Sequence, residues 1–202
     1  ITIDAISNDS GVTTDFITSD DDGLTVTATL SAELNTGQSL MYSNDNGANF
    51  IDITSSVSSD TAVSYVDSGL TSSDTIQMKI VDSIGQETTV VTQSVVIDTS
   101  AVAPTATTEI IDTNQSTSVS VAEAGTIYLV KHDATITSVA DITNLNNNQY
   151  NTVTATGAGS FNVPASGLTP DDYVAYFVDT AGNLSGVGAN TVTVEAVPLE
   201  LY

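Results

Sequence analysis

Short runs in which apolar and polar residues alternate recur along the whole chain. Residues 24–30 (LTVTATL) give the clearest run, because every second side chain is apolar, as in a strand with one buried face. Clusters of Gly, Asn, Asp and Ser separate these runs and indicate turns. The pattern predicts an all-β chain with strands over residues 2–7, 24–30, 39–44, 49–54, 62–66, 75–81, 90–97, 107–111, 116–121, 126–130, 160–163, 173–178 and 191–194.

Two connections between these runs stand out. Asp45-Asn46-Gly47 lies between alternating runs, and an Asn-Gly pair in that place is a strong hairpin signal. Residues 134–151 form a longer, Asn-rich excursion, in which residues 138–142 fit a short helical turn. Loops of this length in compact domains are often functional, so the excursion is a candidate binding segment.

The two halves of the chain repeat one plan. SGLT at 68–71 followed by VDSIGQ at 81–86 matches SGLT at 166–169 followed by VDTAGN at 178–183, and 179 − 82 gives an offset of 97 residues. A repeat of this length filled with short strands favours an immunoglobulin-like sandwich. Leu168-x-Pro170-x-x-Tyr173 is also similar to the tyrosine corner of such sandwiches.

The sequence therefore predicts two tandem immunoglobulin-like Greek-key β-sandwiches. The first covers residues 1–98, the second covers residues 105–202 and contains the Asn-rich insertion, and residues 99–104 link them. Pro104 fixes its own φ and favours extended geometry at Ala103, so we expect a short, stiff linker.

The charge balance narrows the choice of partners. The chain has 25 acidic residues, two lysines and no arginine, which gives a net charge of −23. Nucleic acid and anionic membrane surfaces are disfavoured, because both are bound through Lys and Arg. There is no cysteine and no segment apolar enough to insert into a membrane, and the opening residues already follow a strand pattern, so we expect a piece of a longer exported polypeptide.

Calcium is the cofactor that these carboxylates suggest. Asp accounts for 19 of the acidic residues, several of them crowded into loops, and Ca²⁺ prefers six to eight oxygen ligands. In a Greek-key sandwich the first loop lies at the same end as the C-terminus, and the last hairpin lies at the other end. We therefore expect a junction site, with Asp82 serving a preceding domain; the candidate ligands are Asp9, Asp15, Asp20, Asp22, Asp82, Asp98, Asp179 and Asn183.

Alternative interpretations of the acidic residues remain. Solvated loop carboxylates, which serve solubility or adaptation to high salt, explain the charge without an ion. An EF-hand at Asp20-Asp21-Asp22-Gly23 fails, because Thr29 stands where a bidentate Glu is needed.

The sequence does not predict an enzyme. It has a single histidine, His132, no Gly-x-Ser-x-Gly elbow and no cysteine for zinc. Tyr173, Tyr176 and Phe177 alternate along one strand, so they are expected in the core or on strand faces rather than on one sugar-binding platform.

Several motifs occur in the order found in one family. They are NDSG at 8–11, DFITSD at 15–20 ahead of Leu24-Thr25-Val26, SNDNG at 43–47 and VIDT at 96–99, then GTIYLV at 125–130 in the second half. In this respect the chain resembles tandem bacterial Ig-like (BIg) domains of giant, calcium-dependent, type I-secreted (RTX-type) adhesins. Departures from the family pattern are Phe50 where a Trp is expected and Gln86 where the second half has Asn183.

The resemblance implies an extracellular extender at the bacterial cell surface, in cell adhesion and biofilm. Its partners would be neighbouring Ig-like domains of the same chain, stiffened by Ca²⁺, and the chain itself would be monomeric. The alternative is a calcium-assisted module that binds a host or surface glycan or a peptide through residues 134–151. A calcium-insensitive surface-layer or pilus-type protein is a third interpretation.

Overall fold

The computed structural model describes residues 1–197 of the chain. The chain divides into two compact units, Ile1–Thr99 and a second that begins at Ser100. Strands form nearly all of the regular structure, so the prediction of an all-β chain is confirmed. None of the helices in the described part of the chain is long and apolar enough to span a membrane.

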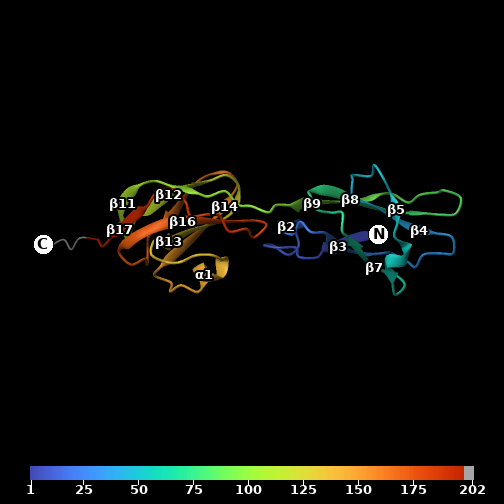
Figure 1. Ribbon diagram of the computed structural model, residues 1–202, viewed down its shortest axis with the longest axis horizontal. Coiled ribbons are helices and arrows are strands. Elements are labelled where there is room, and N and C mark those ends of the chain that lie inside the picture. The colour runs from blue at the N-terminus through green and yellow to red at the C-terminus, as the bar shows by residue number, and fades with distance from the viewer. Residues whose placement is uncertain (198–202) are drawn as a thin grey trace. The chain divides into compact units, whose positions relative to one another are not determined.

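The first unit consists of two sheets that share one core (Figure 1). All neighbouring strands are antiparallel except β2 and β9, which are parallel. One sheet has the order β1 (Thr2–Ile6), β3 (Leu24–Thr29), β7 (Ala62–Asp67), β6 (Val57–Ser58), and the other has the order β2 (Ile17–Thr18), β9 (Val91–Ile97), β8 (Asp74–Val81), β4 (Ser39–Ser43), β5 (Ile51–Asp52). A 3-10 turn, η1 (Thr54–Ser56), follows β5.

The second unit has the same plan. Its one parallel pair, β11 with β17, corresponds to β2 with β9. One sheet has the order β10 (Thr105–Ala106), β12 (Ser116–Val121), β15 (Gly159–Pro164), and the other has the order β11 (Glu109–Asp112), β17 (Val192–Glu195), β16 (Asp171–Asp179), β13 (Ala124–Lys131), β14 (Tyr150–Thr156). The helix α1 (Val139–Thr143) lies between β13 and β14. In both units the first two strands lie in different sheets, β1 and β2 in the first unit and β10 and β11 in the second, as in immunoglobulin-like sandwiches.

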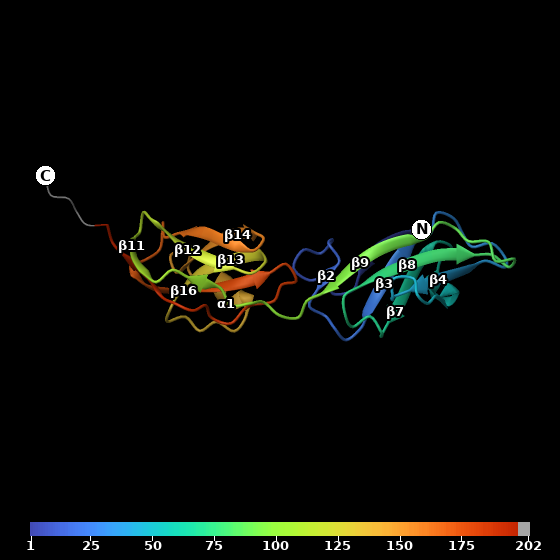
Figure 2. The same cartoon turned by 90° about the horizontal axis from the view of Figure 1, so that it is seen from above.

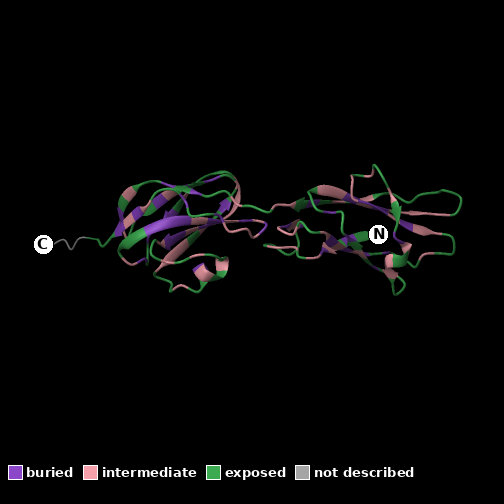
Figure 3. Ribbon diagram, in the orientation of Figure 1, coloured by how far each residue is buried: buried purple, intermediate pink, exposed green. Residues whose placement is uncertain are grey.

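Each unit has a separate hydrophobic core between its two sheets (Figure 3). Leu24, Val26 and Ile76 are fully buried in the first core, and Ile127 and Phe177 are fully buried in the second. These residues come from the alternating runs, because every second side chain of such a strand points inward. Burial of this apolar surface is the main term that stabilises each sandwich.

The tyrosine corner that the sequence indicates is present. Tyr173 is fully buried, and its hydroxyl donates a hydrogen bond of 2.8 Å to the backbone oxygen of Thr169. This bond satisfies a phenol that would otherwise be buried without a partner.

The structure differs from the expected strands in several places, and β2, β6 and β14 form where no strand was expected. The strand predicted over 107–111 begins only at Glu109, as β11, and the unexpected β10 precedes it in the other sheet, because the chain changes sheets at residues 107–108. The strand predicted over 49–54 pairs only at β5, since η1 begins at Thr54. The Asn-rich excursion contains α1 and ends earlier than predicted, because β14 begins at Tyr150.

The segment before β10 packs on the second unit. Ala101 lies against the second core, and Pro104 is buried. A Cβ added to Gly188 would lie 2.6 Å from the backbone oxygen of Pro104, so glycine is required for this close approach.

Candidate metal centre

The acidic loop between β1 and β3 is held in a defined conformation. Thr18 is fully buried, and its hydroxyl donates to the backbone oxygen of Asn8 and accepts from the backbone N–H of Asp20 at 3.0 Å. Phe16 is buried with a φ of +61°, an uncommon value for a bulky residue. These contacts and the pairing of β2 with β9 position the carboxylates of the loop.

Asp9 and Asp15 form the first acidic pair of this loop. Asp9 Oδ2 accepts from the backbone N–H of Phe16 at 3.3 Å, and Asp9 Oδ1 is buried with no hydrogen-bond partner among the described residues. Burial raises the pKa of the Asp9 carboxyl, and the neighbouring Asp15 raises it further. A buried carboxylate oxygen without a partner is energetically costly, so this group fits a cation.

Asp20 and Asp22 form the second acidic pair. Asp20 accepts from the side-chain amide of Asn8 and from the backbone N–H of Asp22, and these bonds lower its pKa. The pKa of Asp22 is raised by its proximity to Asp20. The structure thus brings the four candidate ligands of the loop together in two pairs.

Asp98 follows β9 at the same end of the first unit. Its backbone N–H donates to the backbone oxygen of Thr18 at 2.9 Å, beside the acidic loop. The parallel register of β2 with β9, in which Thr18 pairs with Ile97, fixes this placement.

Asp82 organises the last hairpin of the first unit. Its Oδ1 accepts from the backbone N–H of Ile84 at 3.0 Å and from that of Gln86 at 2.8 Å, while Gly85 takes a φ of +82°. Asp82 is therefore a turn-forming carboxylate, and the structure brings no other candidate ligand to it.

Asp179 has the equivalent position in the second unit. Its Oδ1 accepts from the backbone N–H of Asn183 at 2.8 Å, and its Oδ2 accepts from the side-chain amide of Asn183 at 2.8 Å. The bridge between Thr105 and Ala189 places this hairpin at the end of the unit where the chain enters. Asp82, which accepts from Gln86, and Asp179, which accepts from Asn183, are 97 residues apart (179 − 82), and this is the offset of the sequence repeat.

Glu123 is a further acidic residue that the sequence did not single out. It lies in the turn between β12 and β13, and its carboxylate comes within 4.8 Å of that of Asp179. Gly125 permits this approach, because a Cβ there would lie 2.9 Å from the Cα of Asp179. The turn between the second and third strands lies beside the last hairpin in this topology, and that relation could have indicated Glu123.

The chemistry of these groups suits a hard cation. Every oxygen donor comes from Asp, Glu or Asn, and neither Cys nor His takes part, which favours calcium over zinc. Both lysines are engaged elsewhere, Lys79 with Glu87 at 2.7 Å and Lys131 with Asp133 at 3.1 Å and Asp171 at 3.0 Å. The acidic ends of the two units therefore have the ligand types and the excess negative charge for Ca²⁺.

The strand order and the parallel pair in each unit define an immunoglobulin-like class of β-sandwich. No protein-family model matches the chain, and a search of curated proteins gives no match. The solved structures that are similar to the chain include three proteins of low sequence identity. They are the BSP domain of a biofilm-associated protein (18% identity, TM-score 0.32, 91% of this chain and 29% of that one), the FN1–FN3 domains of chicken CNTN1 (14%, 0.42, 95% and 65%), and a Ca²⁺-stabilized adhesin that helps an Antarctic bacterium bind ice (20%, 0.35, 97% and 49%).

The chain spans less than a third of the biofilm-associated structure and about half of the ice-binding adhesin. At these identities and TM-scores the likeness extends to the general fold only, so the function is argued from the residues of this chain.

Proposed function

We propose that this chain is an extender segment of a large bacterial surface adhesin, located outside the cell and stiffened by Ca²⁺. The observation that carries the proposal is the buried oxygen Asp9 Oδ1, which has no partner among the described residues and lies in a loop of paired carboxylates. A bound cation would satisfy this oxygen and would offset the repulsion within each pair.

The repeated architecture supports the extender role. Two sandwiches of the same topology follow each other, one with acidic groups where its last strand ends and the other with acidic groups where its first strand begins. In the proposal, Asp98 and the acidic loop bind calcium at the first of these ends, and Glu123, Asp179 and Asn183 bind it at the second. Ions bound there would limit the motion of the linker, residues 99–104.

A calcium titration tests the metal-binding part of the proposal. The melting temperature of the whole chain is compared in chelator and in about 10 mM calcium, a concentration roughly ten times a weak extracellular dissociation constant. Mass action then predicts a gain of about 1.4 kcal/mol per site in the free energy of unfolding. Asp9→Asn should reduce the gain, because it removes the charge at the unpartnered oxygen.

The matched control is Asp60→Asn, which also removes one negative charge from the first unit at an exposed position away from the loop. This variant should keep the calcium response of the natural sequence. A melting temperature that is the same with and without calcium would remove the basis of the proposal, and equal responses of the two variants would remove Asp9 from the site.

A further inference from the structure

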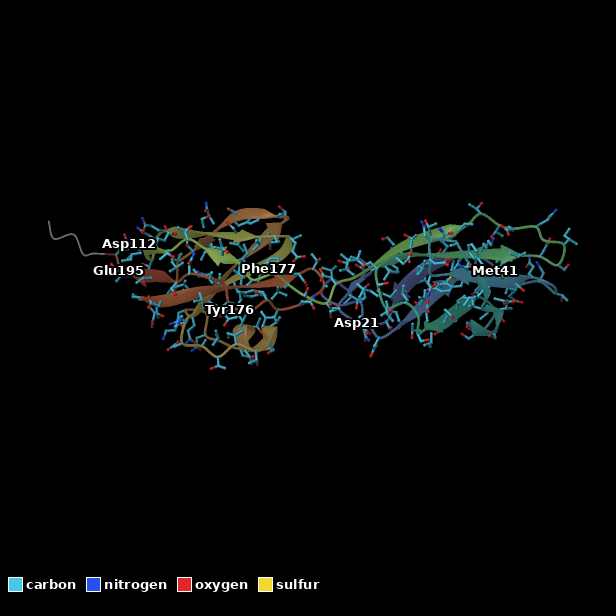
Figure 4. All side chains as sticks on the ribbon, turned by 45° about the horizontal axis from the view of Figure 1, so that its top comes forward. Asp21, Met41, Asp112, Tyr176, Phe177 and Glu195 are labelled. Atoms are coloured by element: carbon cyan, nitrogen blue, oxygen red, sulfur yellow. The ribbon has the colours of Figure 1, made fainter. Side chains whose placement is uncertain are left out.

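The second unit carries three half-buried tyrosines on neighbouring strands. Tyr128 of β13 lies opposite Tyr176 of β16, and Tyr150 of β14 places its ring 6.4 Å from that of Tyr128. Residues opposite each other in register share a face of the sheet, and Ile127 and Phe177 point into the core from the other face. Figure 4 shows Tyr176 and Phe177 on opposite sides of β16. We call this outer surface the tyrosine face.

The segment that carries α1 covers one end of the tyrosine face. Val130 and Val174 point to the outer side of the sheet but are 0% and 6% exposed, and Ile142 of α1 is fully buried. Two perpendicular views place α1 against this sheet (Figures 1 and 2). The helix therefore buries the valine end and leaves the tyrosine rings beside it partly open.

The hydroxyls of these tyrosines have no internal role. The fully buried Tyr173 donates to Thr169, and Tyr42 of the first unit donates to Asp67 at 2.8 Å. The hydroxyls of Tyr128, Tyr150 and Tyr176 make no hydrogen bond to any described residue, and burial raises the pKa of Tyr128 and of Tyr176. Half-buried phenols normally find a partner, so these three groups are available to a ligand.

A shallow hollow adjoins Tyr150. It has a volume of about 180 Å³ and is lined by Asn147, Tyr150, Asn151 and Thr152. Its walls offer amide and hydroxyl groups next to an aromatic ring, and its size suits one ring-sized part of a ligand rather than a whole drug-sized molecule.

The charge of the face limits the ligand class. A polyanion is repelled by a chain of net charge −23, and a second copy carries the same charge with no opposite charge here to offset it. A cationic partner would be drawn to the acidic loops instead. The nine positions around the tyrosines on β13, β14 and β16 are uncharged, while the acidic residues Asp112, Asp172 and Glu195 lie farther along the same side of the sheet. The uncharged positions are Thr126, Tyr128, Val130, Tyr150, Thr152, Thr154, Val174, Tyr176 and Val178.

We propose that the tyrosine face binds a neutral oligosaccharide, with sugar rings stacked on Tyr128 and Tyr150 and hydroxyls bonded to the tyrosine hydroxyls and to Asn147. Sugar rings have apolar C–H faces and a rim of neutral hydroxyls, which match aromatic rings flanked by amides. This role goes beyond the extender function and requires no calcium. The tyrosine face is not the group Tyr173, Tyr176 and Phe177 considered from the sequence, because only Tyr176 of that group lies on it.

The test uses the whole chain and five neutral probes: cellohexaose, laminarihexaose, xylohexaose, maltohexaose and mannohexaose. Tyrosine fluorescence reports binding directly, because the chain has no tryptophan, and NMR locates the perturbed rings. We expect at least one probe to bind with a Kd of about 1 mM or tighter, equally in calcium and in chelator. Tyr128→Ala and Tyr150→Ala should each weaken binding about tenfold, the loss typical of one stacked ring.

Two further variants separate loss of binding from loss of folding. Asn147→Ala lies in an exposed turn outside the sheet and should weaken binding without affecting folding, whereas Tyr65→Phe in the first unit should have no effect. The proposal is overturned if no probe binds at about 10 mM, a tenfold excess over the expected Kd. It is equally overturned if the tyrosine variants bind as the natural sequence does, if chelator abolishes binding, or if the rings respond to protein concentration alone, which would make the face a contact between copies.

Discussion

At the scale of single residues, Asp67 is a buried carboxylate with several hydrogen-bond donors around it. It is 5% exposed, and it accepts from the Tyr42 hydroxyl at 2.8 Å, from the Asn44 side-chain amide at 2.9 Å and from the backbone N–H of Gly69 at 2.9 Å. All three donors are neutral, so hydrogen bonds rather than an ion pair stabilise the charge. The carboxylate ties β4, β7 and the turn after β7 together.

Replacing Asp67 by Ala should lower the free energy of unfolding by about 3 kcal/mol, because it leaves the Tyr42 hydroxyl and other donors without their acceptor. Urea unfolding measures this as a lower midpoint at an unchanged m-value. Asp21→Ala removes the same charge from an exposed loop position and should change stability by less than about 0.5 kcal/mol. Equal losses in the two variants would contradict the structural role of Asp67.

Tyr42 links stability to alkaline pH. Burial raises the pKa of Tyr42 far above its usual value, and the neighbouring Asp67 raises it further. Above about pH 10 the unfolded chain releases this proton while the folded chain retains it, so the free energy of unfolding falls as pH rises. Tyr42→Phe should reduce the slope of stability against pH between about pH 10 and 11.5. An unchanged slope in urea unfolding would show that other tyrosines cause the loss.

At the scale of elements, the close contact of β13 with β16 depends on Gly125. A Cβ at this position would meet the backbone oxygen of Val178 and would lie 2.6 Å from the ring of Phe177. Gly125→Ala should therefore cost about 2 kcal/mol of stability by overpacking. Gly157→Ala is the control, since a Cβ there meets nothing within 4 Å. Differential thermal unfolding of the two variants measures the effect, and equal melting temperatures would disprove it.

The helix α1 is fixed by a capping box. The Ser138 hydroxyl accepts from the backbone N–H of Asp141 at 3.3 Å, and Asp141 Oδ2 accepts from the backbone N–H of Ser138 at 2.8 Å and of Thr137 at 2.9 Å. These bonds lower the pKa of Asp141 to about 2. The cap is complete above the unfolded value of 3.8 and is lost as pH falls through about 2.

Amide exchange of Ile142 should therefore accelerate as pH is lowered from about 4 to 2, beyond the change in intrinsic rate. Asp141→Asn should show the faster opening already at pH 5 and little further change. If the variant and the natural sequence open alike at pH 5, the carboxylate does not hold the helix.

The strands were predictable where one face is buried, as in β3, because alternation records that burial directly. The short strands were not predictable: β2 has two residues inside a polar loop and exists because β9 lies beside it. The same distinction holds for the candidate metal ligands. Carboxylate-rich loops are visible in the sequence, but the burial of Asp9 Oδ1 and the approach of Glu123 to Asp179 arise from packing between distant segments.

At the scale of the whole molecule, the proposed function depends on how freely the two units move about the predicted linker, residues 99–104. A net charge of −23 makes the units repel each other when no counter-ion is bound, so we expect them to sample many relative orientations in chelator. If calcium binds the acidic ends as proposed, it would offset this repulsion and narrow the range of orientations.

Small-angle X-ray scattering should then give a narrower distribution of shapes in calcium than in chelator. Asp98→Ala and Asp179→Ala should each give the chelator-like profile even in calcium, because each removes a carboxylate from a different unit. The melting of each sandwich should be retained in both variants, since the two cores lie elsewhere, and Asp60→Asn should respond to calcium as the natural sequence does. Identical scattering in all of these samples would mean that calcium does not restrict the motion between the two units.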